Sequence, residues 1–266
     1  MTAPADSDRM TFFEHIEALR PHLVRSAVVV CLLLIAAFCC KGLLIDGVLF
    51  GPLSASFPTN RLINLLAAAA DLEYRATTLD TLQLVNTAIA GQFNLHLKIS
   101  IVTALIVAFP YLIWEAWRFV RPALTLRERQ LCRRMAWQVC GAFLLGLCFG
   151  YLVIAPLSIS FLTQYTVSEA VHNLIDVRSY LTTVMQVSVA CALLFQLPLL
   201  VRLLTHIGVI SSDLLRRYRR HAILILALLA AVITPPDAFS MVLVLLPLMG
   251  LYEYSIGVAK RAEKRP

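Results

Sequence analysis

The sequence predicts an all-α polytopic membrane protein with six transmembrane helices and both termini in the cytoplasm. Three observations predict this fold class: the low share of charged residues, the length of the uncharged segments, and the gathering of basic residues on one side of them. Of the 266 residues, 59% are hydrophobic and 15% are charged, whereas soluble domains carry about 25% charged residues. Residues 135–155 and 179–201 contain no Asp, Glu, Lys or Arg, and uncharged stretches near this length are candidate membrane spans.

Apolar segments divide the chain into a transmembrane domain and two cytoplasmic ends. A segment in lipid must satisfy its own backbone hydrogen bonds, so each span is predicted to be a helix. We expect an amphipathic segment at 1–21, a transmembrane domain at 22–258 and a basic tail at 259–266. The six candidate spans cover residues 22–43, 97–116, 135–155, 179–201, 220–234 and 238–258.

Basic residues fix the orientation of the predicted spans. Eighteen of the 23 Lys and Arg residues precede or open span 1, lie between spans 2 and 3, lie between spans 4 and 5 or open span 5, or follow span 6. The positive-inside rule assigns this side to the cytoplasm. We therefore interpret the net charge of +7 as an orientation signal. Basic runs such as 216–220 are not expected to bind nucleic acid.

The N-terminal segment is expected to form a short amphipathic helix that leads into span 1. Thr11 and Glu14 have the spacing of a capping box, and apolar side chains follow at helical intervals. Pro21 either kinks this helix or begins span 1 as a separate helix. The chain begins with a polar stretch of mixed charge, so we expect the first apolar run to be an anchor and not a cleaved leader.

The fifth span is short for a membrane crossing. Residues 221–234 contain no Lys, Arg, Asp or Glu, and these 14 residues rise by roughly 21 Å against a hydrocarbon core of about 30 Å. Spans 5 and 6 either cross a locally thinned bilayer or form a re-entrant hairpin. We favour crossing, because the tip formed by Pro235, Pro236 and Asp237 is better suited to water than to lipid.

Two polar segments are expected outside the membrane. The first, at 44–96, is the longer and has room for a short helix at 63–70, and the second lies at 156–178. None of the seven cysteines falls in either segment. Disulfides form in oxidising compartments, so we expect the cysteines to be packing residues.

Motifs of common enzyme and metal chemistry are missing from the sequence. It has no GxxxxGK[ST], HExxH, GxSxG or CxxC pattern, and its six histidines are scattered. No nucleophile and base, and no set of metal ligands, stand at a recognised spacing. We therefore expect a protein that is not an enzyme and that needs no cofactor or metal.

Three features have both a structural and a functional interpretation. Glu128 is the one acid among six arginines between spans 2 and 3, and by itself it is typical of a helix-start residue paired with a neighbouring Arg. Gln196 lies near the interior of span 4, where a polar amide either joins helices or carries a function. Gly146 and Gly150 form a small-xxx-small pattern that predicts close helix packing.

Several short motifs follow one another in an order that resembles a known family. The chain resembles TatC, the receptor subunit of the twin-arginine protein translocase, from about residue 12 to 260. No single motif is decisive, but their order and their sides of the membrane are specific. The motifs are HIEALR at 15–20, GPL at 51–53, WRFVRPAL at 117–124 followed by Glu128 and Arg129, FGY at 149–151 with Pro156, FQLP at 195–198 and TPPD at 234–237.

The resemblance implies a function in the export of folded proteins. TatC-type receptors bind signal peptides that carry a pair of arginines, on the cytoplasmic face. They work with single-span partners of the TatA and TatB type in hetero- and homo-oligomers, and the proton-motive force powers transport. The sequence has no transit-like leader, which favours the bacterial inner membrane over an organelle membrane.

The resemblance also implies which residues contact the signal peptide. Glu128 matches the family's loop carboxylate and is the first candidate for an arginine contact. The family usually has two adjacent acids before Leu-Arg, but here the second is Ala18, so we expect Glu14 or Glu17 to substitute for it. The remaining candidates shape the site or flank its acids: Leu19, Arg20, Phe119, Pro122, Leu124 and Arg129.

A second set of residues is implied in partner binding or translocation. Asp237, with Pro235 and Pro236, matches the outer tip where family partners dock, and Pro52 lies in the first outer loop. Gln196 stands where many members have Glu. An amide keeps the hydrogen bonding and loses the charge, so a proton-linked role at this position is not supported.

Two other classes of function remain as alternatives. A secondary transporter should have an ionisable residue in the middle of a span, and the best candidate, Gln196, is uncharged. A structural membrane scaffold should tolerate the loss of its cytoplasmic carboxylates.

Overall fold

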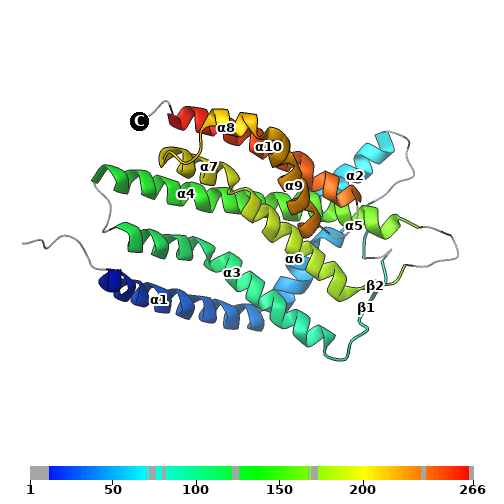
Figure 1. Cartoon of the computed structure of the whole chain (residues 1–266). Coiled ribbons are helices and arrows are strands. Elements are labelled where there is room, and N and C mark those ends of the chain that lie inside the picture. The colour runs from blue at the N-terminus through cyan, green and yellow to red at the C-terminus, as the bar shows by residue number, and fades with distance from the viewer. Residues whose placement is uncertain are drawn as a thin grey trace, which may run out of the picture. The chain divides into compact units, whose positions relative to one another are not determined.

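The computed structural model describes residues 12–69, 71, 76–79, 82–121, 126–166, 168, 173–234 and 238–263. For residues 12–16, 18, 126–132 and 239 the description covers the backbone only. The chain is almost entirely helical within these ranges (Figure 1). In chain order the elements are α1 (Phe12–Cys39), the π-helix η1 (Leu43–Leu49), the 3-10 helix η2 (Gly51–Leu53), α2 (Pro58–Ala69), β1 (Leu84–Val85), α3 (Gly91–Val120), α4 (Leu126–Phe149), the π-helix η4 (Gly150–Ile154), α5 (Ala155–Gln164), β2 (Ile175–Asp176), α6 (Val177–Leu194), α7 (Leu197–His206), α8 (Ser212–Arg217), α9 (Arg219–Ile233) and α10 (Ala238–Glu263).

The chain divides into two compact units. The first comprises Met1–Cys39 and Ser100–Cys140, and the second comprises Cys40–Ile99 and Gly141–Pro266. The first unit therefore contains α1, most of α3 and the N-terminal part of α4. The second contains most of the predicted spans 3 to 6 and the segment between spans 1 and 2.

In the first unit, α1 runs as one helix from the N-terminal segment into the predicted span 1. Pro21 lies inside this helix, so it does not begin a separate one. Apolar side chains such as Leu23 and Leu32 are exposed on its surface. Exposed leucines along a helix of this length are what a lipid-facing span requires.

Five helical stretches of the described chain are long and apolar enough to cross a membrane. They are Leu19–Cys39, Gly91–Val120, Arg133–Gln164, Val177–His206 and Ser240–Glu263. They correspond to predicted spans 1 to 4 and 6. The predicted span 5 is a helix, α9, but it has only 15 residues, which rise by about 22 Å. The prediction of six membrane crossings is therefore not confirmed at this helix.

Spans 3 and 4 are interrupted helices. The π-helix η4 lies between α4 and α5, and α6 gives way to α7 at Phe195 and Gln196, just before Pro198. Proline lacks the backbone N–H that a continuous helix would use, so a new helix begins there. The side-chain amide of Gln196 donates to the carbonyl of Ala192 at 3.3 Å, within the same turn of the chain.

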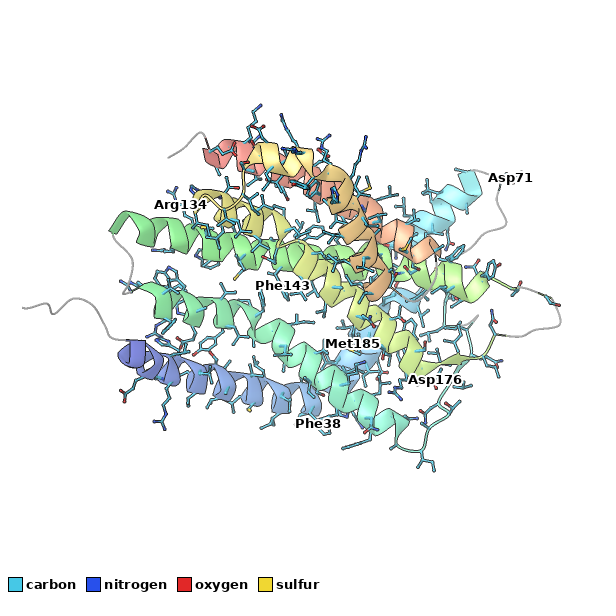
Figure 2. All side chains as sticks on the ribbon, viewed as in Figure 1. Phe38, Asp71, Arg134, Phe143, Asp176 and Met185 are labelled. Carbon is cyan, nitrogen blue, oxygen red and sulfur yellow. The ribbon has the colours of Figure 1, made fainter. Side chains whose placement is uncertain are left out.

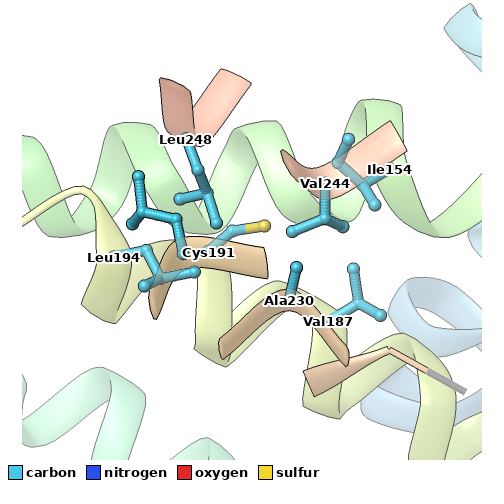
Figure 3. Close-up of a cluster of buried hydrophobic side chains, with 8 residues drawn as sticks. Ile154, Val187, Cys191, Leu194, Ala230, Val244 and Leu248 are labelled. Carbon is cyan, nitrogen blue, oxygen red and sulfur yellow. The ribbon is translucent and has the colours of Figure 1, made fainter. Parts of the chain in front are cut away.

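A buried apolar cluster holds the second unit together. Figure 3 shows side chains from η4, α6, α9 and α10 meeting around Cys191 and Ala230. In a membrane protein such packing is driven by close contact between helices, because lipid is as apolar as the side chains themselves. The cluster consists of Ile154, Val187, Cys191, Leu194, Leu226, Ala230, Val244 and Leu248.

Glycines allow α4 and η4 to approach α6 closely. A Cβ atom on Gly146 would lie 2.6 Å from the carbonyl oxygen of Cys191, and one on Gly150 would lie 2.8 Å from the Cα atom of Ser188. Real Cβ atoms do not come so near to backbone. The predicted close packing at this glycine pair is therefore confirmed.

Side-chain hydroxyls fasten residues 43–69 to the spans of the second unit. The Tyr180 hydroxyl donates to the carbonyl of Leu49 at 2.9 Å, and the Tyr151 hydroxyl donates to the carbonyl of Val48. These carbonyls end η1, where regular helical partners run out. The predicted short helix at 63–70 is confirmed as part of α2. A short parallel pairing of β1 with β2 was not predicted.

Candidate functional site

A buried carboxylate lies between α1 and α3 in the first unit. Glu115 is 1% exposed, although it carries a charge in a largely apolar helix. His22 Nδ1 lies 2.6 Å from Glu115 Oε2, and the Tyr111 hydroxyl donates to Glu115 Oε1 at 2.9 Å. Arg118 Nη1 lies 3.7 Å from Oε1. Tyr111 and Arg118 stand four residues before and three residues after Glu115, so all three share one face of α3.

The contact with His22 fixes the position of a histidine ring. An ionised carboxylate only accepts hydrogen bonds, so the hydrogen in this bond belongs to Nδ1 of His22. The His22 ring meets the ring of Phe119 edge-to-face, with centroids 5.9 Å apart. We call these residues, His22, Tyr111, Glu115, Arg118 and Phe119, the Glu115 cluster.

Aromatic side chains continue along α3 beside the cluster. The Trp114 and Trp117 rings lie 5.0 Å apart, and the Arg121 guanidinium lies 5.4 Å from the centre of the Trp117 ring. Stacking of this kind holds a guanidinium in place through the negative face of the ring. Paired tryptophans beside arginines are typical of the boundary between lipid and water.

Of the residues predicted to bind a signal peptide, the structure describes part of the set in detail. Glu17, Leu19 and Arg20 lie on the surface of α1, and Leu19 is 39% exposed. Phe119 is half-buried in the Glu115 cluster. Glu17 therefore offers its carboxylate to solvent.

The other predicted binding residues lie outside the described side chains. The backbone of Glu14 belongs to α1, and the backbones of Glu128 and Arg129 belong to the first turns of α4. Pro122 and Leu124 fall outside the described residues altogether. The proximity of these residues to Phe119 stays a prediction.

The structure also describes only some of the residues that were predicted to bind partners or act in translocation. Pro52 is buried in η2, where the Asn60 side-chain amide donates to its carbonyl at 2.7 Å. Gln196 lies at the break between α6 and α7. Pro235, Pro236 and Asp237 fall outside the described residues.

The sequence analysis missed Glu115 and His22. A signal was present, because Glu115 is an acid within a predicted span, and ionisable residues inside spans tend to be functional. His22 could not be matched to it, since 93 positions separate the two residues in the chain. Among the described residues, no group of three or more His, Cys, Asp and Glu side chains could hold a metal ion.

Among the described side chains of the first unit, the exposed carboxylate of Glu17 can bind a cation. The described acids of the first unit are carboxylates on or between helices, with Glu17 exposed and Glu115 enclosed. Carboxylates pair well with guanidinium groups.

A comparison with known protein families shows which family this chain belongs to. Residues 14–247 match the family model described as "Sec-independent protein translocase protein (TatC)". The chain belongs to the TatC family. The matched region includes the first four stretches that are long enough to cross a membrane, and the beginning of the fifth, up to residue 247.

Curated TatC proteins match the chain over nearly its whole length. The TatC protein of Blattabacterium sp. subsp. Periplaneta americana is 36% identical over 265 residues, which cover 98% of this chain and 98% of that protein. The TatC protein of Deinococcus radiodurans is 31% identical and covers 97% of this chain, with 88% of its own length matched.

Solved TatC structures share the fold. A crystal structure of the twin-arginine translocase receptor TatC in DDM superimposes with a TM-score of 0.72 at 26% identity, covering 92% of this chain and 99% of that chain. A second TatC crystal structure gives a TM-score of 0.68 at 25% identity, covering 94% of this chain and all of the other. This TatC-family chain is thus a polytopic helical membrane protein of the protein-transport machinery.

Proposed function

We propose that this chain is the receptor that binds twin-arginine signal peptides and helps to export folded proteins across a bacterial inner membrane. The observation that carries the proposal is the TatC family match over residues 14–247. The exposed carboxylate of Glu17 on α1 is consistent with it. The chain acts as a receptor and not as an enzyme, and the proton-motive force supplies the energy.

Recognition rests on pairs of carboxylate and guanidinium. A planar guanidinium binds a carboxylate through two parallel hydrogen bonds, whereas an ammonium lacks this fork. Each hydrogen bond to a charged group contributes about 1.5 to 3 kcal/mol. Glu128 binds one arginine, and Glu17 or Glu14 takes the role of the acid that the family usually has at the position of Ala18.

Transport requires partners that this chain does not contain. We propose that single-span subunits of the TatA and TatB type dock at the tip formed by Pro235, Pro236 and Asp237. Pro52 and Gln196 contribute to partner binding or translocation. Both termini face the cytoplasm, which places Glu17 on the side from which cargo arrives.

The proposal is tested by crosslinking the detergent-solubilised protein to a photoreactive signal peptide that bears either Arg-Arg or Lys-Lys. We expect crosslinking to Arg-Arg that falls for Lys-Lys and for Glu128→Gln. Asp46→Asn, which removes an acid from η1, is the control and should change nothing. Equal crosslinking of both peptides, or none, would remove the receptor function and favour a scaffold.

The same crosslinking assay tests whether Glu14 or Glu17 substitutes for the acid that is missing at Ala18. Glu14→Gln and Glu17→Gln remove one candidate charge each, and Ala18→Glu in either background restores an acid at the usual position. We expect one of the two single variants to lose crosslinking and Ala18→Glu to recover it. Full crosslinking of the Arg-Arg peptide by both single variants would contradict this assignment.

A further inference from the structure

We propose that Glu115 is a positioning residue for signal-peptide recognition, which restrains the ring of His22 and neutralises the cation of Arg118 beside the peptide site. This inference rests on the proposed function, and it concerns a residue that does not touch the peptide. Its carboxylate is 1% exposed and already has three partners, His22, Tyr111 and Arg118. No side of it is open to an incoming arginine.

Burial makes the charge of Glu115 dependent on its neighbours. An ionised carboxylate away from water is stable only when paired and hydrogen-bonded. His22 from α1 supplies the short contact at 2.6 Å, and Arg118 supplies a cation at 3.7 Å from the other oxygen. In return, the carboxylate of Glu115 keeps the guanidinium of Arg118 close to α3, although the Arg118 side chain is 47% exposed.

The peptide to be recognised is itself doubly positive. Arg20, Arg118 and Arg121 all lie exposed on the parts of α1 and α3 that carry Glu17 and Phe119. Exposed charges influence one another over about 10 Å at moderate salt. A cation released near this surface would therefore repel the twin arginines, while one paired with Glu115 or stacked on Trp117 repels them less.

The same carboxylate acts on Phe119 through His22. Phe119 is expected to shape the signal-peptide site, and its ring packs edge-to-face on the His22 ring at 5.9 Å. Loss of the bond between His22 and Glu115 would leave the imidazole free to turn. Phe119 would then lose its edge-to-face contact with a ring held in one orientation.

The test measures the affinity of the Arg-Arg peptide in nanodiscs at low and high salt. Glu115→Gln keeps the shape of the side chain and removes its charge. We expect its affinity to fall by about threefold to tenfold at low salt, with most of the loss disappearing at about 0.5 M salt. Adding Arg118→Gln to Glu115→Gln should restore most of the affinity, because the released cation is then absent.

The chain provides a matched control in its second unit. Glu253 pairs with Arg219 at 2.6 Å on the surface, and Glu253→Gln makes the same substitution in an exposed pair of Glu and Arg. We expect its peptide affinity and salt dependence to equal those of the unmodified protein. Thermal unfolding of each variant checks that the fold is retained.

The outcomes separate the inference from the proposed function. If the unmodified protein does not prefer Arg-Arg over Lys-Lys, the proposed function fails and this inference fails with it. If that preference holds but Glu115→Gln binds normally, the inference alone is overturned. A loss that neither salt nor Arg118→Gln reverses would make Glu115 merely structural, and this also overturns the inference.

A second variant covers the case in which Glu115→Gln does not fold. Glu115→Asp keeps the charge and withdraws it by one methylene from His22 and Arg118. We expect a smaller loss of affinity with the same sensitivity to salt. Affinity and salt dependence equal to those of the unmodified protein would overturn the inference.

Discussion

In the segment that contains Pro52, a polar side chain makes hydrogen bonds to backbone carbonyls. Asn60 is fully buried, and its amide donates to the carbonyls of Pro52 at 2.7 Å and Ser54 at 2.9 Å. A buried carbonyl without a partner costs free energy. One asparagine therefore determines the path of the chain through η2.

Asn60→Ala should loosen this segment. Removing the amide leaves the carbonyl of Pro52 without this donor, whereas the carbonyl of Ser54 keeps the backbone N–H of Phe57 at 3.0 Å. We expect the free energy of unfolding to fall by about 1 to 3 kcal/mol. Thermal unfolding in detergent measures this change. Asn86→Ala, which removes an exposed amide bonded to the carbonyl of Ala88, is the control and should have little effect. Equal losses in both variants would contradict the assignment.

Asp176 combines a helix cap with a contact between distant segments (Figure 2). Its Oδ1 accepts from the backbone N–H of Arg178 at 2.7 Å, and its Oδ2 accepts from the Thr87 hydroxyl at 2.8 Å. The hydrogen bond from Thr87, followed by that from Arg178, holds the pKa of Asp176 below its ordinary value. The ionised form therefore favours the folded state.

The stabilisation by Asp176 should depend on pH in a defined direction. A lowered pKa contributes stability above the unfolded pKa of about 3.9, and this contribution is lost as pH falls through the folded pKa. We expect the unmodified protein to melt at a higher temperature than Asp176→Asn at neutral pH. The difference in Tm should shrink below about pH 4. A difference that persists unchanged in acid would contradict this account.

In the second unit, α4 comes close to α6 because a glycine at the contact has no side chain. Gly146 allows α4 to approach the carbonyl of Cys191 and the ring of Phe195 closely. Gly141 lies earlier in the same helix, and a Cβ atom added there would meet nothing within 4 Å. The two positions therefore differ in environment although both are glycines in α4. This contrast supplies a controlled experiment.

Gly146→Ala should destabilise the protein and Gly141→Ala should not. The added methyl group at residue 146 meets backbone at 2.6 Å, so the helices must separate, at a cost of about 1 to 3 kcal/mol. At residue 141 the methyl group meets nothing within 4 Å, and the loss of glycine entropy slightly favours the helix. Thermal unfolding in one detergent compares the two variants. A larger loss at residue 141 would refute the packing account.

Breaks within spans were only partly predictable. Pro198 indicated that span 4 could not continue unchanged, and α7 does begin at Leu197. Pro156 is a comparable signal in span 3, because it lies in the first turn of α5, directly after the π-helix η4. The type of irregularity was not predicted, since a proline does not by itself specify a π-helix. Gly150, the first residue of η4, packs against Ser188 and Cys191.

The topology of the whole molecule depends on whether α9 crosses the membrane. Its 15 residues rise by about 22 Å, which is less than the hydrocarbon core of about 30 Å. Arg219 at its start pairs with Glu253 at 2.6 Å, so a charged pair stands at one end. A thinned bilayer around α9 and α10 would allow both helices to cross.

Cysteine accessibility in intact cells decides this question. In a variant without native cysteines, a single cysteine at Ala238, which is exposed at the start of α10, should react with a membrane-impermeant maleimide from outside. A cysteine at Ser56 in the segment predicted to be outside is the positive control, and one at Ser211 is the negative control. Labelling at Ser56 but not at Ala238 would favour a re-entrant hairpin.

The candidate site was predictable only where it follows from family motifs. Phe119, Glu17 and Glu128 were found from their neighbours in the chain, and all three belong to the first unit. Glu115 was overlooked, because its meaning depends on His22, which approaches from another helix. Its environment is a property of the assembled helices.

Hydropathy and charge placed the helices along the chain, because lipid offers no hydrogen bonds to a bare backbone and so forces apolar segments to be helical. They also predicted the short helix now seen as α2. Contacts between distant residues were decided by tertiary structure alone: Tyr180 reaches the carbonyl of Leu49 across 131 positions, and His22 reaches Glu115 across 93. Many hydroxyls, carbonyls and acids in the sequence are chemically equivalent, and only packing selects which of them meet.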